Sequence, residues 1–315
     1  MPNQRSSHVT PTARGGGLAI VVAQTLALVC LAMLGYMPGW LLAPLAGGAL
    51  AVAGVGYLDD RGRVSVGTRL LVHVLAAAWA LCCLGGMPPI VWGRGSFDLG
   101  WLGHLLGFLG IVWTLNLFNF MDGIDGIAAS ESVSMCWCAV LLAWMAGTAG
   151  VGIASPATNA ALVFGAACAG FLLWNWPPAK IFMGDIGSGY IGYTVAVIAL
   201  AAARDNPVAL WIWLILGGVF FVDATATLVR RMFRGERIYE AHRSHAYQRL
   251  ARRWGSHRPI TFAVLLINVA WLAPCAGLAT LHPEFAAGLC ALAWFPLLCL
   301  VLLVGAGLED TPRPA

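Results

Sequence analysis

The chain has 315 residues, of which 60% are hydrophobic and only 10% are charged, and its mean hydropathy is +0.80. Soluble domains carry about 25% charged residues, so this composition excludes an ordinary water-soluble protein and predicts an all-α polytopic transmembrane protein. The net charge is only +4, and no basic run is interleaved with aromatic residues, so we expect no nucleic-acid partner. No Cys-x-x-Cys pair occurs among the nine cysteines, and neither a zinc site nor a disulfide scaffold is indicated.

Apolar runs along the chain predict about ten transmembrane helices, each long enough to cross the hydrocarbon core of a bilayer. The first run directly follows the polar residues 1–16. Because that run is long enough to span, we interpret it as a transmembrane helix and not as a signal peptide. The predicted spans cover residues 17–36, 40–57, 68–87, 101–119, 131–148, 159–176, 187–204, 208–229, 259–281 and 285–306.

The basic residues predict the orientation of these spans. All but Arg94 and Arg204 of the 18 Lys and Arg residues fall in loops on one side, which the positive-inside rule assigns to the cytoplasm. With an even number of spans, both termini lie on that side. We interpret residues 1–315 as one integral-membrane domain of a plasma (inner) membrane. Residues 1–16 form a cytoplasmic segment, and residues 230–258 form a cytoplasmic loop, called the Arg/His loop below.

Residues 112–131 are the most informative stretch. An apolar run breaks there into Asn116, Asn119, Asp122 and Asp125, spaced three apart, with two glycines between them. At 100° per residue these side chains spread over about half of a helix circumference, and each glycine weakens a helix by about 1 kcal/mol. We therefore expect the fourth span to end here, with its polar groups facing a site at the membrane surface. A solvated loop after a span is the alternative.

Further polar groups lie on the same predicted side. Asp59 and Asp60 close the second span, and Asp185 lies in residues 184–188 at the start of the seventh. Asp59 and Asp60 alone are also compatible with a charged turn, and the Arg/His loop with a topology signal or anionic lipid headgroups. The candidate residues of that loop are His242, Arg243 and His245.

This one-sided cluster favours a particular chemistry. Carboxylates and amides without cysteine suit a hard cation such as Mg²⁺, which completes its coordination with phosphate oxygens and water. Residues 184–188 place backbone N–H groups at a helix N-terminus, where we expect them to bind phosphate. The Arg/His loop adds cationic donors for phosphate. Together with the lipid boundary, these features predict phosphoryl transfer to or from a lipid.

Four motifs then resemble those of a known family: residues 56–60 (GYLDD), 116–126 (NLFNFMDGIDG), 182–188 (FMGDIGS) and 242–245 (HRSH). In sequence, order and sidedness they are similar to the polyprenyl-phosphate N-acetylhexosamine-1-phosphate transferases, the MraY and WecA superfamily, membrane glycosyltransferase family 4. The region around residues 242–245 is closest to the branch that starts bacterial O-antigen synthesis. The run of consecutive histidines that the peptidoglycan branch has at this place is absent.

The resemblance implies that undecaprenyl phosphate attacks a UDP-N-acetyl sugar at its β-phosphate and releases UMP, with Mg²⁺ required. Asp185 is similar to the Mg²⁺ ligand, and Asp59 and Asp60 resemble the pair near the lipid phosphate. His242, Arg243 and His245 occupy the place of a pyrophosphate-contacting loop. The substrate-binding candidates are Asn116, Asn119, Asp122 and Asp125, for the nucleoside and sugar, and Phe182, which resembles the aromatic residue that stacks on uracil.

Two rival functions remain at this stage. One is the phospho-MurNAc-pentapeptide transferase of peptidoglycan synthesis, against which the missing histidine run argues. The other is an ion-coupled transporter, which would place its polar groups near the bilayer midplane on broken helices. The family also implies one more span ahead of residues 3–17, and a cytoplasmic N-terminus fits the loss of one span. A homodimer is compatible with the sequence.

Overall fold

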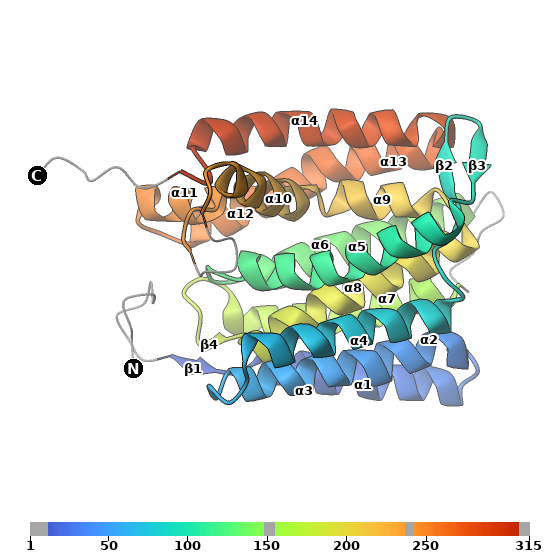
Figure 1. Cartoon of the computed structure of the whole chain (residues 1–315), viewed down its shortest axis with the longest axis horizontal. Helices are drawn as coiled ribbons and strands as arrows, with labels where there is room; N and C mark the ends of the chain where they lie inside the picture. Colours follow the sequence, from blue (N-terminus) through green and yellow to red (C-terminus); the bar gives the residue numbers. More distant parts are fainter. Residues whose placement is uncertain (1–11, 148–154, 237–241, 309–315) are drawn as a thin grey trace, which may run out of the picture.

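The computed structural model describes residues 12–147, 155–236 and 242–308, and its helices run side by side in one bundle (Figure 1). Within these residues eight helices are long and apolar enough to cross a membrane, and the bent pair α9 (Ala209–Leu216) and α10 (Gly218–Phe233) makes a ninth candidate. Helix α1 (Gly17–Met33) is apolar but shorter, with 17 residues. The all-α polytopic prediction is confirmed, and each of the ten predicted spans coincides with one of these helical segments.

Local sequence signals mark several helix ends. At the start of α4 (Val66–Leu84), Ser65 Oγ accepts a hydrogen bond from Thr68 N. The same helix ends at Gly85, which has the left-handed conformation with φ +77°. Pro156 occupies the first turn of α7 (Pro156–Asn175). The remaining helical elements of the described residues are α2 (Gly39–Ala43), the π segment η1 (Pro44–Gly48), α3 (Ala49–Asp59), α5 (Gly100–Met121), α6 (Ile127–Gly147), α8 (Asp185–Asp205), α11 (Ala246–Trp254), α12 (Arg258–Ile267), the π segment η2 (Asn268–Leu272), α13 (Ala273–Leu281), the 3₁₀ turn η3 (Pro283–Phe285) and α14 (Ala286–Val304).

Helix α8 is the centre of the bundle. Its apolar window is 94% buried, whereas no other candidate span exceeds 50%. Glycines allow its neighbours to approach closely: Gly17 of α1 meets the backbone of Gly187, and Gly56 of α3 meets the carbonyl of Asp185. A Cβ at either glycine would collide with backbone atoms, so both positions require glycine. The N-terminus of α8 is thereby fixed between α1 and α3.

Two short strand pairs lie at opposite ends of the bundle (Figure 1). β1 (Ala13–Arg14) pairs in parallel with β4 (Ile181–Phe182), and this pairing brings the segment before α1 beside the segment before α8. At the other end, β2 (Ile90–Trp92) and β3 (Gly95–Phe97) form an antiparallel hairpin. The β1–β4 end is the end where the polar motifs gather.

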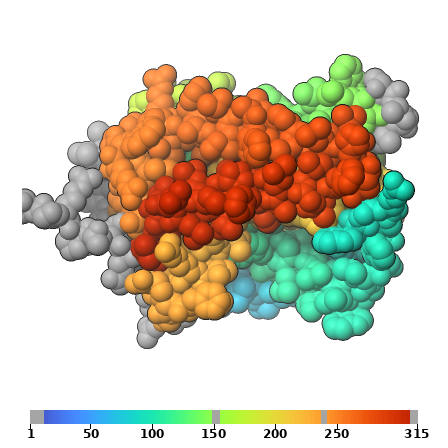
Figure 2. Space-filling model, turned by 90° about the horizontal axis from the view of Figure 1, so that it is seen from above, coloured from blue at the N-terminus to red at the C-terminus, as the bar shows by residue number. Residues whose placement is uncertain are grey.

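One face of the bundle is formed by α12, α13 and α14, and this face is hollowed between α14 (red), α10 (amber) and α5 (green-teal) in Figure 2. Helices α9 and α10 meet there at an angle of 71° at Gly217. Part of the predicted Arg/His loop is helical, because residues 246–254 form α11. Residues 237–241 of that loop lie outside the described residues.

Candidate active site

Asp60 organises the start of α8. Its two carboxylate oxygens accept hydrogen bonds from the backbone N–H groups of Asp185 (3.0 Å) and Ile186 (3.2 Å), and Arg14 Nε lies 3.0 Å from Asp60 Oδ1. Gly184 has φ +77°, and a Cβ there would lie 2.6 Å from Asp60 Oδ2. The expectation that these amides bind phosphate was therefore wrong, since Asp60 caps them from another helix.

Asp185 stands beside this cap and has one engaged and one available oxygen. Oδ1 accepts from Asn119 Nδ2 at 3.1 Å and lies 3.4 Å from Arg14 Nη2. Asn119 Nδ2 also donates to Ser188 Oγ at 2.9 Å. In the part of the chain that the structure describes, Oδ2 of Asp185 accepts no hydrogen bond. An oxygen of a fixed carboxylate is thus presented at the end of the bundle.

Asp59, the sequence neighbour of Asp60, forms an ion pair with Arg69. Arg69 Nη1 lies 2.5 Å from Asp59 Oδ2, and the guanidinium of Arg61 lies over the ring of Tyr57, 4.2 Å from its centroid. The turn after α3 is therefore a network of ion pairs as well as a carboxylate pair. Arg14 and Arg69 belong to the site but were not identified from the sequence, because their partners lie 46 and 10 residues away.

Asp122 follows the last residue of α5, so this helix ends where the sequence predicted. Among the described residues its carboxylate makes no hydrogen bond or ion pair. Burial raises the pKa of Asp122 well above its usual value, and the negative charges of Asp185, Asp60 and Asp125 raise it further, against a smaller opposing effect of Arg14. Asp122 therefore faces Asp185 across a crowded, negatively charged region that a bound cation would stabilise.

Three other predicted residues are turned toward the protein itself. Asp125 Oδ2 accepts from Ala179 N at 2.9 Å and Asp125 Oδ1 lies 3.2 Å from His257 Nδ1. Asn116 Nδ2 donates to the Val112 carbonyl of its own helix at 2.7 Å. The half-buried Phe182 contributes its carbonyl to Gly15 and Gly16. Substrate contact by Asp125, Asn116 and Phe182 remains a prediction.

Asp223 of α10 holds the segment that contains the HRSH motif. Its carboxylate accepts from the N–H groups of Ala246 (2.9 Å) and Tyr247 (3.0 Å), the first residues of α11. His245 Nδ1 lies 3.4 Å from Asp223 Oδ1, and Thr227 Oγ1 donates to the same oxygen at 3.0 Å. Asp223 is 3% exposed, so a buried carboxylate caps α11.

Tyr247 attaches α11 to the loop after α5. Its hydroxyl donates to the Phe120 carbonyl at 2.9 Å, and its ring covers Gly123, where a Cβ would collide with the hydroxyl. Burial, followed by the charges of Asp223 and Asp122, raises the pKa of Tyr247 well above its usual value, so the hydroxyl remains a donor. Asp122 therefore lies between Asp185 on one side and α11 on the other.

The HRSH motif contributes less positive charge than its composition suggested. Burial, His245 and Arg231 lower the pKa of His242 to about 4, so its imidazole is neutral at pH 7. His242 Nδ1 is 2.9 Å from Ser244 Oγ, and its ring centroid is 4.9 Å from that of His245. Arg243 is exposed, and its guanidinium makes no ion pair or hydrogen bond with any described residue. Arg243 is thus the cation of this motif that is available to an anionic ligand.

Comparison with known proteins identifies the family. The model of glycosyl transferase family 4 matches residues 41–203. Over 276 residues the chain is 31% identical to a protein of Bacillus subtilis (strain 168), the probable undecaprenyl-phosphate N-acetylglucosaminyl 1-phosphate transferase, with 85% of this chain and 73% of the relative aligned. The chain belongs to glycosyl transferase family 4. The family expected from the four motifs is confirmed.

Two further relatives define the range of similarity within glycosyl transferase family 4. The decaprenyl-phosphate N-acetylglucosaminephosphotransferase of Mycobacterium leprae (strain TN) is 30% identical over 297 residues, covering 84% of this chain and 73% of the relative. The phospho-N-acetylmuramoyl-pentapeptide-transferase of Moorella thermoacetica is 28% identical over 242 residues, covering 70% of each chain. The relatives therefore include N-acetylglucosamine-phosphate transferases as well as a phospho-N-acetylmuramoyl-pentapeptide-transferase.

This family 4 member has an apolar cavity of about 300 Å³ between α5, α8 and the bent α9–α10 pair. Its walls are almost entirely hydrophobic, and they come from the same helices that border the hollow in Figure 2. The cavity lies in the membrane-spanning part of the bundle. Residues that line it include Ile111, Trp113, Ala196, Trp213, Phe221 and Trp294.

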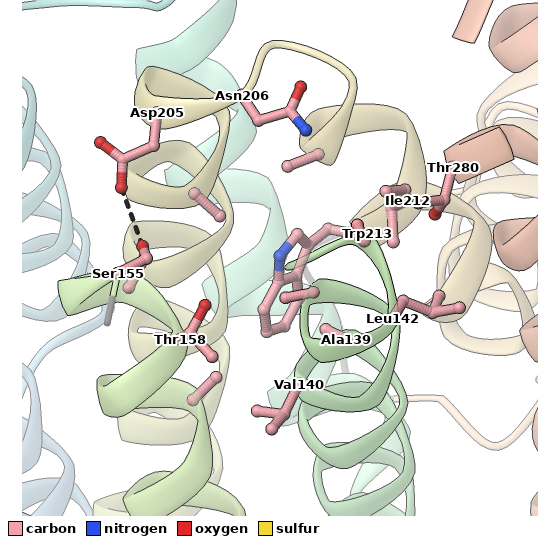
Figure 3. A pocket seen from close by; sticks show the side chains of 16 residues that line it. Ala139, Val140, Leu142, Ser155, Thr158, Asp205, Asn206, Ile212, Trp213 and Thr280 are labelled. Carbon is pink, nitrogen blue, oxygen red and sulfur yellow. Dashed lines mark hydrogen bonds between the residues drawn. The ribbon is translucent and has the colours of Figure 1, made fainter. Parts of the chain in front are cut away.

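A second cavity, of about 70 Å³, lies at the opposite end of α8 and is lined mostly by alanines and other small apolar residues. Figure 3 shows Asp205 at its rim, where Ser155 Oγ donates to Asp205 Oδ2 at 2.8 Å. Asp205 is the one acidic residue in the lining of this cavity, which lies away from β1 and β4. The cavity is therefore separate from the acidic site, which is formed by Asp59, Asp60, Asp122 and Asp185.

The oxygen donors of the acidic site fit magnesium better than zinc. No group of three or more His, Cys, Asp or Glu side chains is arranged to hold a metal ion within residues 12–147, 155–236 and 242–308. Mg²⁺ does not require such a group, because it binds proteins through one or two carboxylates and completes its shell with phosphate and water. Asp185 Oδ2 and the Asp122 carboxylate offer that set.

Proposed function

We propose that the chain transfers N-acetylhexosamine-1-phosphate from a UDP-sugar to undecaprenyl phosphate, releases UMP, and thereby starts the synthesis of O-antigen or a related surface polysaccharide. Membership of glycosyl transferase family 4 and the names of the relatives support a polyprenyl-phosphate sugar-1-phosphate transferase. The observation that carries the proposal is the pair of available carboxylates, Asp122 and Asp185, at the end of the bundle where Tyr247 attaches α11 to the end of α5.

The chemistry of the acceptor decides which groups the reaction needs. A phosphate monoester has a second pKa of about 6, so the acceptor is already mostly dianionic at neutral pH, and a general base contributes little. The larger obstacle is repulsion, since two unit charges 4 Å apart repel by about 4 kcal/mol at an effective dielectric constant of 20. The site therefore has to bring two anionic phosphates together, which requires positive charge and exact positioning more than proton removal.

Mg²⁺ is the cofactor that we propose for this task, with Asp185 and Asp122 as the residues that would hold it. When bound, the ion supplies charge neutralisation at the phosphates. Asn119 and Arg14 fix the Asp185 carboxylate through its other oxygen, and Asp60 fixes the helix end that carries it. Asp59 and Asp60, which we predicted near the lipid phosphate, act in this proposal mainly through Arg69 and Arg14.

Arg243 is proposed to bind the pyrophosphate of the nucleotide sugar. Its guanidinium has no partner among the described residues, and the segment that carries it is fixed by Asp223. Arginine pairs with phosphate through two parallel hydrogen bonds. His242 is neutral at pH 7 and acts here as a neutral hydrogen-bonding group, while His245 is buried against Asp223.

We propose that the apolar cavity holds the isoprenoid chain of the lipid acceptor. Its walls come from α5, α8, α9, α10 and α14, and α5 and α10 also carry Asn119 and Asp223 toward the acidic site. An isoprenoid chain in this cavity would bring its phosphate to the end of the bundle where Asp185 lies. We propose that this end faces the cytoplasm, because the excess of Lys and Arg residues is on that side.

The donor sugar and the branch of the family are tested together. Purified protein in lipid nanodiscs is incubated with undecaprenyl phosphate and, in turn, UDP-GlcNAc, UDP-GalNAc and UDP-MurNAc-pentapeptide, and the lipid product is identified by mass spectrometry. We expect an undecaprenyl-pyrophosphoryl N-acetylhexosamine and equimolar UMP. Product from UDP-MurNAc-pentapeptide alone would assign the chain to peptidoglycan synthesis. Uptake of a solute into vesicles without a new lipid would indicate a transporter.

A further inference from the structure

A buried polar cluster outside the acidic site joins three helices. Glu131 of α6 is completely buried, and Asn268 lies in the π segment η2 and is 1% exposed. Asn268 Nδ2 donates to Glu131 Oε2 at 2.6 Å and to Ser134 Oγ at 2.8 Å. The backbone N–H of Phe220, in the first turn of α10, also acts on the carboxyl group.

The donors of this cluster are all used, and two acceptors remain. Both hydrogens of the Asn268 amide are committed, and Ser134 Oγ donates to the Glu131 carbonyl at 2.9 Å. Glu131 Oε1 and Asn268 Oδ1 nevertheless accept no hydrogen bond from any described residue. These two buried acceptors lie on adjoining side chains. One additional hydrogen, carried by one of the two oxygens and donated to the other, would satisfy both.

The charge of the cluster leads to the same conclusion. The groups that act on the Glu131 carboxyl among the described residues are the Asn268 amide and the Phe220 N–H, and no charged side chain is among them. An ionised carboxylate without a cation is costly inside a membrane span. With the Asn268 amide turned over, its oxygen would face Glu131 Oε2 at 2.6 Å, and that contact also requires a hydrogen.

We infer that Glu131 is a neutral carboxylic acid whose proton is hydrogen-bonded to Asn268, and that this acid–amide pair positions the helices that carry the active site. Through it α6, which begins two residues after Asp125, is tied to η2 and to the N-terminus of α10 just after the 71° bend. Asp223, three residues beyond Phe220, then holds α11 and the HRSH segment. The positioning role rests on the proposed transferase function, whereas the protonation state does not.

Infrared spectroscopy of the full-length protein tests the proton directly. The spectrum of wild type minus that of Glu131→Gln, recorded in nanodiscs at pH 7 with and without Na⁺, should show the C=O stretch of a protonated carboxylic acid. A carboxylate band in its place would overturn the inference, since Glu131 would then be ionised beside a water molecule or a metal cation. A band that changes with Na⁺ would overturn it as well.

Activity measurements test the positioning role. Glu131→Gln keeps the shape and offers an N–H donor to Asn268, so its kcat should stay within about twofold of wild type. Glu131→Leu leaves Asn268 unsatisfied and should lower kcat by about tenfold. Ser132→Ala is the matched control, because Ser132 is buried in the same helix but bonds the Ala128 carbonyl of that helix. A tenfold loss in Glu131→Gln would refute a neutral acid that only positions helices.

The infrared and activity measurements distinguish a failure of the proposed function from a failure of the inference about Glu131. If no variant transfers sugar phosphate to a polyprenyl acceptor, the proposed function fails, while the infrared band still decides the protonation of Glu131. If Glu131→Leu does not fold, the spectra of wild type and Glu131→Gln decide the proton, and the kcat of Glu131→Gln decides whether a neutral group suffices.

Discussion

Helix α8 carries a carboxylate at each end, and the two ends differ in what surrounds it. At the first residue, Asp185 has Asn119 and Arg14 on one oxygen and none of the described residues on the other. At the last residue, Asp205 accepts a hydrogen bond from Ser155 Oγ at 2.8 Å. Its neighbour Arg204 donates to the Leu84 carbonyl and lies over the ring of Trp40. One oxygen of each carboxylate is thus without a partner among the described residues, and the two ends differ in the charged residues that lie around it.

The difference shows how a buried helix can organise a site without contributing many functional side chains. The Asp185 end gathers Asp59, Asp60 and Asp122, whose repulsion is offset in part by Arg14 and Arg69. Such crowding costs stability, and the proposed function explains why it is retained, because a cation and phosphates would bind there. At the Asp205 end, the contacts of Asp205 and Arg204 are with a hydroxyl group, a backbone carbonyl and an aromatic ring, and none of these partners is a carboxylate.

The largest expected effect comes from changing Asp185. Asp185→Asn keeps the shape but removes the negative charge, so kcat/KM should fall by about 10³-fold, and the dependence of the residual rate on Mg²⁺ should disappear. Steady-state kinetics over a range of Mg²⁺ concentrations measures both. Asp205→Asn, at the other end of the same helix, is the matched control. Equal losses in the two variants would contradict the asymmetry of α8.

Arg243 should give the next largest effect. Arg243→Ala removes a charge-assisted contact to phosphate, so kcat/KM for the nucleotide sugar should fall by about 10- to 100-fold. Arg94→Ala, on the opposite side by the charge distribution, should leave the kinetics unchanged. If Arg243→Ala has wild-type kcat and KM at equal expression, the HRSH segment serves membrane topology and not substrate binding.

Asp60 should affect stability and activity together. Asp60→Ala uncovers the Asp185 and Ile186 amides and leaves Arg14 without its carboxylate partner, which should destabilise the fold by about 1–2 kcal/mol. We expect a lower thermal midpoint in detergent and about a tenfold loss of kcat, since Asp185 loses its support. Loss of activity with an unchanged midpoint would mean that Asp60 contacts substrate directly.

His242 should give a smaller effect that depends on pH. Because its pKa in the folded protein is lowered to about 4 from 6.5, the unfolded chain binds a proton first as the pH falls. The stability that neutral His242 contributes is therefore present above pH 6.5 and is lost between pH 6.5 and 4. His242→Gln should show a weaker decline of thermal midpoint over this interval. An identical decline in both proteins would contradict the assignment.

Much of the fold could be predicted because its signals are local. Apolar runs gave the helical segments, and the predicted fourth span ends at residue 119, two residues before the last residue of α5. The contacts that build the site are not local. Arg14 reaches Asp60 and Asp185 only because β1 pairs with β4, and Asp60 caps α8 from a residue 125 positions away. No sequence window contains both partners.

Glu131 shows a different reason for a missed feature. Glu131 is the first residue of the predicted span 131–148 and lies between two serines. A lone carboxylate in an apolar run indicates a functional position, but the role of this one depends on Asn268 and on the bend at Gly217. The bend itself was not predicted, because α9 and α10 together read as one apolar span. A broken helix was expected only of the transporter alternative, yet here it brings α10 and Asp223 to the HRSH segment.

The most direct test of the account is the reaction itself in nanodiscs, with radiolabelled UDP-N-acetylhexosamine, undecaprenyl phosphate and Mg²⁺. The account predicts a labelled lipid product and UMP in equal amounts, both abolished by Asp185→Asn and both retained in Asp205→Asn. Absence of a lipid product with all UDP-sugars tested, or its formation at the wild-type rate by Asp185→Asn, would contradict it.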